Sequence, residues 1–198
     1  LAWARKAELD GAMLEALRRY HSIAAPYERH HNLTTPKQRA EALGSSKEVA
    51  KDRRDEQSWL DYEERQTINE FRTIKSMDDP ENPVGVERLA HDFHLAELLK
   101  RSKVPGVQGE AAQRVLESIY VQTSFYLVRD AFERKDYSRA LMVLTIASRI
   151  YPDRGFVWYT IGAAQARLGH KKEALDALDR ALAGGYHDAA HTLTDDDP

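Results

Sequence analysis

Apolar residues recur along this chain three or four positions apart, the spacing that places side chains on one face of an α-helix. No stretch alternates apolar and polar residues over the length that a strand needs. Glycine and proline are sparse and divide the sequence into a few long segments. The pattern therefore predicts an all-α protein.

Two helices are expected before the long charged segment in the first half of the chain. Residues 2–20 form an amphipathic pattern with one apolar face. A short helix then begins at Thr35, a residue type that caps helices, with Pro36 at its first position. Gly44 is expected to close this helix.

A long, highly charged helix is expected from Ser45 or Ser46, either of which can cap it, to about Met77. Its apolar positions form a narrow stripe, so we expect it to pack on one side only. These positions are Trp59, Leu60, Ile68, Phe71, Ile74 and Met77. Most of its charged residues are expected to form a solvated face.

The stretch 78–83 is the main expected boundary, because it combines two prolines with several acidic residues. It divides the chain into an N-terminal helical region, 1–80, and a helical repeat domain, 84–198, which is expected to pack on it. Within the repeat domain, residues 86–102 predict a Leu-rich helix. The pattern over 109–135 is apolar around much of its circumference, so this segment is expected to be central and buried.

The most specific pattern is an internal repeat with a period of 34 residues. The paired positions are Leu127 with Ile161, Ala140 with Ala174, Leu144 with Leu178, and Ala147 with Ala181. Turns are expected at Lys135–Tyr137 and, one period later, at Gly169–Lys171. The repeat predicts two helical hairpins, at about 120–152 and 154–187.

These residues resemble the tetratricopeptide repeat family, whose units carry a W-x2-L-G-x2-Y motif, an A-x3-F motif and a terminal proline. The matching residues are Trp158, Ile161, Gly162, Ala174, Leu178 and Ala181 in the second unit, and Ala140, Leu144, Ala147 and Pro152 in the first. The resemblance implies small residues where two helices approach closely and a proline that ends a helix. It departs from the family at Ser124, Val128 and Tyr186, which replace the expected Trp, Gly and Pro.

The chain also resembles the helical region that follows an α/β-hydrolase, esterase-like domain in some bacterial proteins. The segments that carry this second resemblance are Ala42–Val49, Val121–Leu127 and Gly184–Asp188. It implies an accessory C-terminal domain of a larger enzyme. Because the sequence starts with Leu1 and stops in a turn-like stretch, it is expected to be part of a longer polypeptide.

Composition narrows the classes of partner. The net charge of −3 lacks the clustered basic excess of a nucleic-acid-binding protein. The absence of cysteine excludes disulfides, thiolate catalysis and Cys-based zinc sites, and it leaves cytoplasm and periplasm both open. No run approaches the roughly 18 apolar residues of a membrane span, so a soluble protein is expected.

Chemistry-bearing motifs are weak in this sequence. It contains no nucleophile elbow, phosphate-binding loop, zinc-protease motif or dinucleotide fingerprint, so no catalytic residue and no cofactor is predicted. His91 and His94 are spaced to share one helix face. A metal site needs a third ligand, which neither they nor the pairs His30/His31 and His187/His191 supply. Surface histidines, and no metal, are therefore expected.

The tetratricopeptide resemblance implies one functional surface. In that family the first helices of successive hairpins line a concave face that binds extended peptides or a partner's helix. The corresponding residues here are Phe125, Arg129, Phe132, Phe156, Tyr159, Ala163 and Arg167. Such a groove would hold an apolar anchor and an acidic group. In the alternative, residues 1–80 cover these aromatics and no groove is free.

Three functions stay open from the sequence. The leading hypothesis is a non-catalytic helical-repeat scaffold that docks a protein or peptide partner, or another domain of its own polypeptide. The second is an accessory domain of a hydrolase. The third is an oligomerisation element in which the long helix over residues 46–77 pairs between chains.

Overall fold

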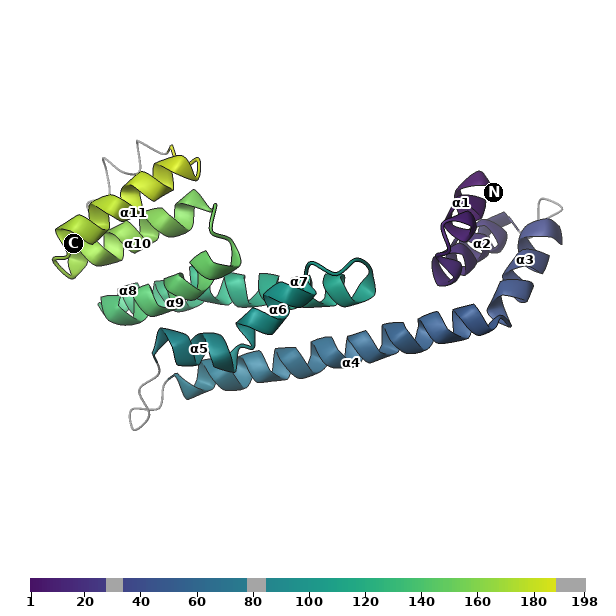
Figure 1. Ribbon diagram of the computed structural model, residues 1–198, viewed down its shortest axis with the longest axis horizontal. Helices are drawn as coiled ribbons and strands as arrows, with labels where there is room; N and C mark the ends of the chain where they lie inside the picture. The colour runs from purple at the N-terminus through teal and green to yellow at the C-terminus, as the bar shows by residue number, and fades with distance from the viewer. Residues whose placement is uncertain (28–33, 78–84, 188–198) are drawn as a thin grey trace. The chain divides into compact units, whose positions relative to one another are not determined.

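The computed structural model confirms the all-α class and describes residues 1–27, 34–77 and 85–187 (Figure 1). Within these ranges helices follow one another and no strand is formed. None of these helices is both long and apolar enough to cross a membrane. The chain divides into two compact units, 1–62 and 63–198. This division falls inside one long helix, and the stretch 78–83, where we expected the boundary, lies outside the described residues.

The first unit contains α1 (Ala2–Leu9), α2 (Met13–Tyr27), α3 (Thr34–Gly44) and the beginning of α4 (Lys47–Ser76). The single helix expected over 2–20 is wrong, because Gly11 adopts a left-handed φ of +78° and breaks it. Helix α2 packs against both α1 and α3. The buried core residues are Ala4, Ala7, Ala16, Leu17, Tyr20, Ala40, Leu43 and Val49.

The start of α4 follows the expected capping chemistry. The hydroxyl oxygen of Ser46 accepts a hydrogen bond from the backbone N–H of Val49, at 3.1 Å. Two further contacts join α4 to α2 in this unit. The Asp52 carboxylate accepts the N–H of Leu14 at 3.3 Å, and Arg18 donates to Glu56 at 2.6 Å.

The second unit contains the rest of α4 and the remaining helices. These are α5 (Val86–Asp92), α6 (Leu95–Arg101), α7 (Val107–Val121), η1 (Gln122–Tyr126), α8 (Leu127–Glu133), α9 (Tyr137–Ile150), α10 (Gly155–Arg167) and α11 (Lys171–Ala183). Helix α9 packs on α5, α8 and α10, and α10 lies side by side with α11 (Figure 1). The helix expected over 86–102 is instead two helices, because His94 adopts a left-handed φ of 54° between them.

Helices α7, η1 and α8 follow one another without a turn, and η1 is a π-helical segment. A π-helical turn takes in an extra residue and so rotates the side chains that follow it. Thr123 and Ser124 are buried here, whereas Phe125 and Tyr126 are 53% and 49% exposed. The expectation that the whole segment over 109–135 is buried is therefore wrong at Phe125 and Tyr126.

The face of α4 that packs within the second unit is polar. Both carboxylate oxygens of Glu63 accept hydrogen bonds from Arg114, at 2.7–3.1 Å. The amide of Asn69 donates to the backbone oxygen of Asp92 at 2.7 Å. Ser118 donates to Glu70 Oε1 at 3.0 Å, and His94 Nδ1 lies 3.1 Å from Gln66 Oε1. We call this row of contacts the α4 polar seam.

The apolar stripe expected to pack α4 is partly exposed instead. Phe71 is 69% exposed and Ile68 is 46% exposed. Ile74 and Met77 are half-buried. The expectation that the stripe forms the packing face is therefore wrong at Ile68 and Phe71, because hydrogen bonds and an ion pair hold the opposite face.

Candidate partner-binding surface

The two turns that separate the paired helices of the repeat have the same backbone geometry. Arg134 and Leu168 both adopt φ −83° and ψ −3°. Lys135 and Gly169 follow with positive φ values of 57° and 78°. The backbone N–H of the next residue then bonds the carbonyl five residues back, from Asp136 to Ala131 at 2.8 Å and from His170 to Gln165 at 3.0 Å. Each turn leads the chain back along the preceding helix, α9 on α8 and α11 on α10.

The small residues of the repeat lie between these helices. Ala140, Leu144, Ala147, Ala174 and Ala181 are buried, as is Gly162, and Leu178 is half-buried. A Cβ on Gly162 would lie only 3.2 Å from the carbonyl oxygen of Ala174. These positions therefore set how closely the helices approach.

Trp158 and Pro152 have a local structural role. The indole N–H of Trp158 donates to the carbonyl oxygen of Pro152 at 2.7 Å. The guanidinium of Arg180 lies 4.5 Å from the centre of the indole ring. Helix α9 ends at Ile150, shortly before Pro152, so these contacts tie the α9–α10 turn to α11.

Phe125, Tyr126 and Arg129 form a contiguous group, which we call the η1 aromatic cluster. The rings of Phe125 and Tyr126 meet edge to face, with centres 5.2 Å apart. The Arg129 guanidinium lies 5.9 Å from the centre of the Phe125 ring. Its Nε lies 3.7 Å from a carboxylate oxygen of Glu133, and both of these side chains are largely exposed. The cluster therefore presents two aromatic rings beside one positive charge.

Two of the expected groove residues are tied into packing. Tyr159 is only 8% exposed, and its ring stacks on Tyr186 with centres 4.4 Å apart. The expectation that Tyr159 lines an open groove is therefore wrong, because Tyr186 covers it. Phe132 is half-buried, packs beside Ala131 and Ala140, and meets Tyr137 edge to face at 5.5 Å. Ala163 is also half-buried.

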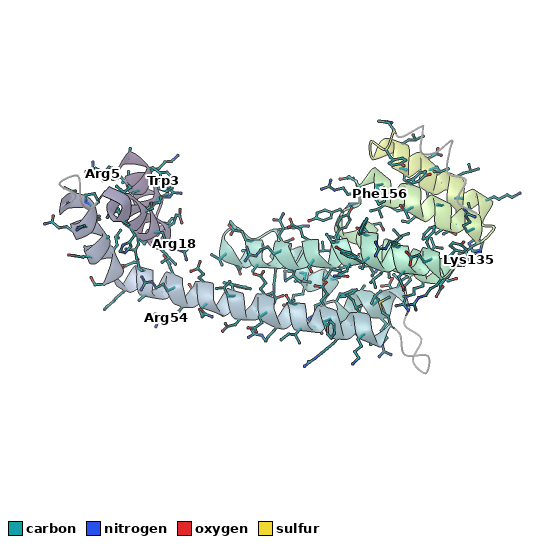
Figure 2. All side chains as sticks on the ribbon, turned by 180° about the vertical axis from the view of Figure 1, so that it is seen from behind. Trp3, Arg5, Arg18, Arg54, Lys135 and Phe156 are labelled. Carbon is teal, nitrogen blue, oxygen red and sulfur yellow. The ribbon has the colours of Figure 1, made fainter. Side chains whose placement is uncertain are left out.

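Phe156 and Arg167 are exposed at opposite ends of α10. Figure 2 labels Phe156 near the start of this helix and Lys135 at the turn between α8 and α9. Eleven residues of helix separate Phe156 from Arg167 by about 16 Å, so they do not converge on one ligand group. Of the expected groove residues, the structure brings together Phe125 and Arg129.

Tyr126 is the member of the cluster that sequence analysis did not select, because it fitted the apolar pattern of a buried helix. In the structure, the π-helical segment η1 places Thr123 and Ser124 on the buried face and leaves Tyr126 outside it.

The histidine pair does not have the geometry expected of it. His91 belongs to α5, whereas His94 follows that helix in a left-handed conformation, so the two do not share a helix face. His91 is highly exposed and lies 3.2 Å from Asp92. No group of three possible metal ligands forms among the described residues. His30, His31 and His191 lie outside these residues.

Helices α5, α6 and α9 border a cleft of about 750 Å³, lined by Ala90, Leu95 and Leu99 together with both histidines. Its charged side chains are already paired. Arg149 donates to Glu87, which lowers the pKa of Glu87 and raises that of Arg149, and Glu97 pairs with Arg101. These charged groups therefore leave no uncompensated charge that could bind a ligand in the cleft.

The first unit contains a cavity of about 590 Å³ beside Glu8, Tyr20 and Arg39. Tyr20 and Arg39 each donate to Glu8 Oε2 at 3.1 Å. These bonds fix α1 to α2 and α3, which gives the polar residues of this cavity a structural role.

Glu70 is a buried carboxylate that sequence analysis did not single out. It is 5% exposed, and its Oε2 atom has no hydrogen-bond partner among the described residues. Burial raises the pKa of Glu70, and the hydrogen bond from Ser118 acts in the opposite direction. Nothing in the sequence distinguishes it from the many solvated carboxylates of α4.

A scan against protein-family models, a search of curated proteins and a search of solved structures each found no match to this chain. The class that the structure itself defines is an all-α protein.

Proposed function

We propose that this chain is a non-catalytic helical-repeat scaffold that binds a protein partner, and that residues 120–187 form two tetratricopeptide-type hairpins. The equal backbone geometry of the two turns, one period apart, supports the repeat. The observation that carries the binding role is the η1 aromatic cluster. Large exposed aromatic rings beside an arginine are the residues that most often dominate the energy of protein interfaces.

The partner is a peptide segment with an apolar side chain next to a carboxylate. The apolar side chain packs on Phe125 and Tyr126, and the carboxylate pairs with Arg129. Arg129 would have to leave Glu133 in order to pair with the carboxylate of the peptide. The contact between Arg129 and Glu133 is long and exposed, so its loss costs little.

The cluster is held on a rigid support. The Thr123 hydroxyl is buried and donates to the carbonyl oxygen of Ile119 at 2.7 Å. Val128 and Ala131 are buried on the same helical segment, against the core. Little backbone ordering is therefore needed when a partner binds.

The test is selection of peptides from a random display library on the full chain. Selected peptides should pair an apolar residue with Asp or Glu, and Phe125→Ala or Arg129→Glu should weaken their binding about tenfold or more. Leu175→Ala is the matched control, because Leu175 is 63% exposed on α11, outside the cluster. Equal binding to all variants would reject this surface.

A further inference from the structure

The polarity of α4 between Glu63 and Thr73 is the reverse of the usual one, because its packed face is polar and its exposed face is apolar. Its packed face is the α4 polar seam, and its exposed face carries Ile68 and Phe71. An amphipathic helix ordinarily buries its apolar side. The exposed side of α4 therefore has the character of a contact surface.

The exposed face has the spacing of a coiled-coil seam. Glu64, Ile68, Phe71 and Lys75 follow one another at intervals of four, three and four residues, and all four are exposed. This is the d-a-d-a pattern of a heptad. We call these four residues the α4 outer face. Among the described residues, no ion pair engages Glu64 or Lys75.

We infer that the α4 outer face pairs with the same face of a second copy of this chain, with the two helices antiparallel. About a two-fold axis midway between Ile68 and Phe71, each Ile68 faces the Phe71 of the other copy. The same axis places each Glu64 opposite a Lys75. The face thus supplies two apolar contacts at its centre and an ion pair at each end.

Self-complementarity argues for a second copy as the occupant. One patch meets itself in a two-fold dimer, so the acidic and basic ends must match within a single helix. The acidic and basic ends of this helix match only when the two helices are antiparallel. A parallel pair would place Glu64 against Glu64 and Lys75 against Lys75. Four core positions bury less than the roughly 800 Å² per partner of a standard interface, so the association depends on concentration.

The first test is the mass of the full chain in solution, measured by sedimentation from about 5 to 500 µM, the range where small interfaces saturate. The mass should rise from 22.6 kDa towards twice that value. Phe71→Glu should stay monomeric with unchanged helical content. Leu175→Glu, at an equally exposed apolar site on α11, should dimerise as the natural chain does.

Charge exchange tests the register. Lys75→Glu should weaken dimerisation about tenfold, because it sets Glu64 against a second carboxylate in both ion pairs. The double change Glu64→Lys with Lys75→Glu should restore it to within about threefold. Three outcomes would overturn the inference. The natural chain could stay monomeric at every concentration, or the double variant could dimerise as weakly as Lys75→Glu. Dimerisation could also be lost in Leu175→Glu and kept in Phe71→Glu.

This inference stands apart from the proposed function, because it uses a different helix. Phe71→Glu should leave the binding of selected peptides unchanged, and Phe125→Ala should leave dimerisation unchanged. Either surface can therefore fail its test without deciding the other.

Discussion

Gly155 and Gly184 are in backbone contact where α10 begins and α11 ends. A Cβ on Gly155 would lie 2.5 Å from the carbonyl oxygen of Ala181, and one on Gly184 would lie 2.8 Å from the Cα of Gly155. The obstacle in each case is backbone, so the helices themselves would have to move. These two glycines set the approach of α10 and α11 more tightly than Gly162 does.

Gly155→Ala should therefore lower the free energy of unfolding by about 1–3 kcal/mol, as overpacking does. Gly162→Ala should cost less, because its new Cβ meets a side chain as well as backbone, at 3.2–3.4 Å. Gly44→Ala, with no atom within 4 Å of its Cβ, should be neutral or stabilising by up to about 1 kcal/mol. Denaturant unfolding measures the free energy of unfolding of all three variants. Equal losses in the three would contradict the close backbone contact between Gly155 and Gly184.

Glu70 predicts a pH dependence of stability with a definite sign. Its folded-state pKa is raised, so the native state binds more protons than the unfolded state between the ordinary pKa of Glu and the raised one. Over that window, stability should fall as pH rises. Glu70→Gln should flatten this slope. Its stability relative to the natural chain should therefore be higher at neutral pH than at acidic pH.

The control for Glu70 is Asp55→Asn, an exposed position on the same helix and outside the α4 outer face. It should leave the pH profile of unfolding as in the natural chain. If Glu70→Gln and Asp55→Asn give the same profile, the Glu70 carboxylate does not govern this slope.

At the scale of the helices, the two hairpin turns differ in their capping. Asp136 caps α9, since its carboxylate accepts the N–H of Arg139 at 2.9 Å. His170 occupies the same position before α11, makes no side-chain cap bond, and has nearly the same φ and ψ. A cap is therefore missing where the backbone is ready for one.

His170→Asp should raise the free energy of unfolding by about 0.5–1 kcal/mol, and Asp136→Ala should lower it by about 1 kcal/mol. Thermal unfolding followed by circular dichroism gives both values. The bond between His170 Nδ1 and Gln165 is lost in the first variant, so Gln165→Ala serves as its control. If His170→Asp is no more stable than Gln165→Ala, the backbone before α11 does not accept a cap as the backbone before α9 does.

Local signals predicted several elements well. A cap of α4 at Ser45 or Ser46, which the structure places at Ser46, follows from residue type. The end of α3 at Gly44 and the turns before Tyr137 and Lys171 follow in the same way. The breaks at Gly11 and His94 were missed, because the apolar spacing continues on both sides of each.

The candidate surface was predictable only in part. Phe125 and Arg129 were found from the repeat, but the π-helical turn that exposes Tyr126 and the ring that covers Tyr159 depend on tertiary packing. The packing side of α4 was misjudged at Ile68 and Phe71 for the same reason. Apolar patterning gives no weight to the partners of Glu63 or Ser118, which lie far away in the sequence.

At the scale of the whole molecule, the chain contains two compact units with separate buried cores. Leu17 is buried in the first and Leu144 in the second. Either residue changed to Ala should cost about 2–5 kcal/mol, by loss of burial and creation of a cavity.

Hydrogen exchange should locate these two losses separately. Leu17→Ala should reduce amide protection in α1–α3, and Leu144→Ala should reduce it in α8–α10, with little change in the other unit. Loss of protection spread evenly over both units would show that they unfold as one.

The α4 polar seam also has a consequence for how this sequence can change over evolutionary time. Apolar contacts tolerate substitution, because neighbouring side chains repack around a changed volume. The contacts of the α4 polar seam are directional hydrogen bonds, so a change at one position also removes the bonds of its partner. Among natural relatives of this chain, positions 63 and 114 should therefore covary, and so should 70 and 118, while the apolar core beside them exchanges one aliphatic residue for another.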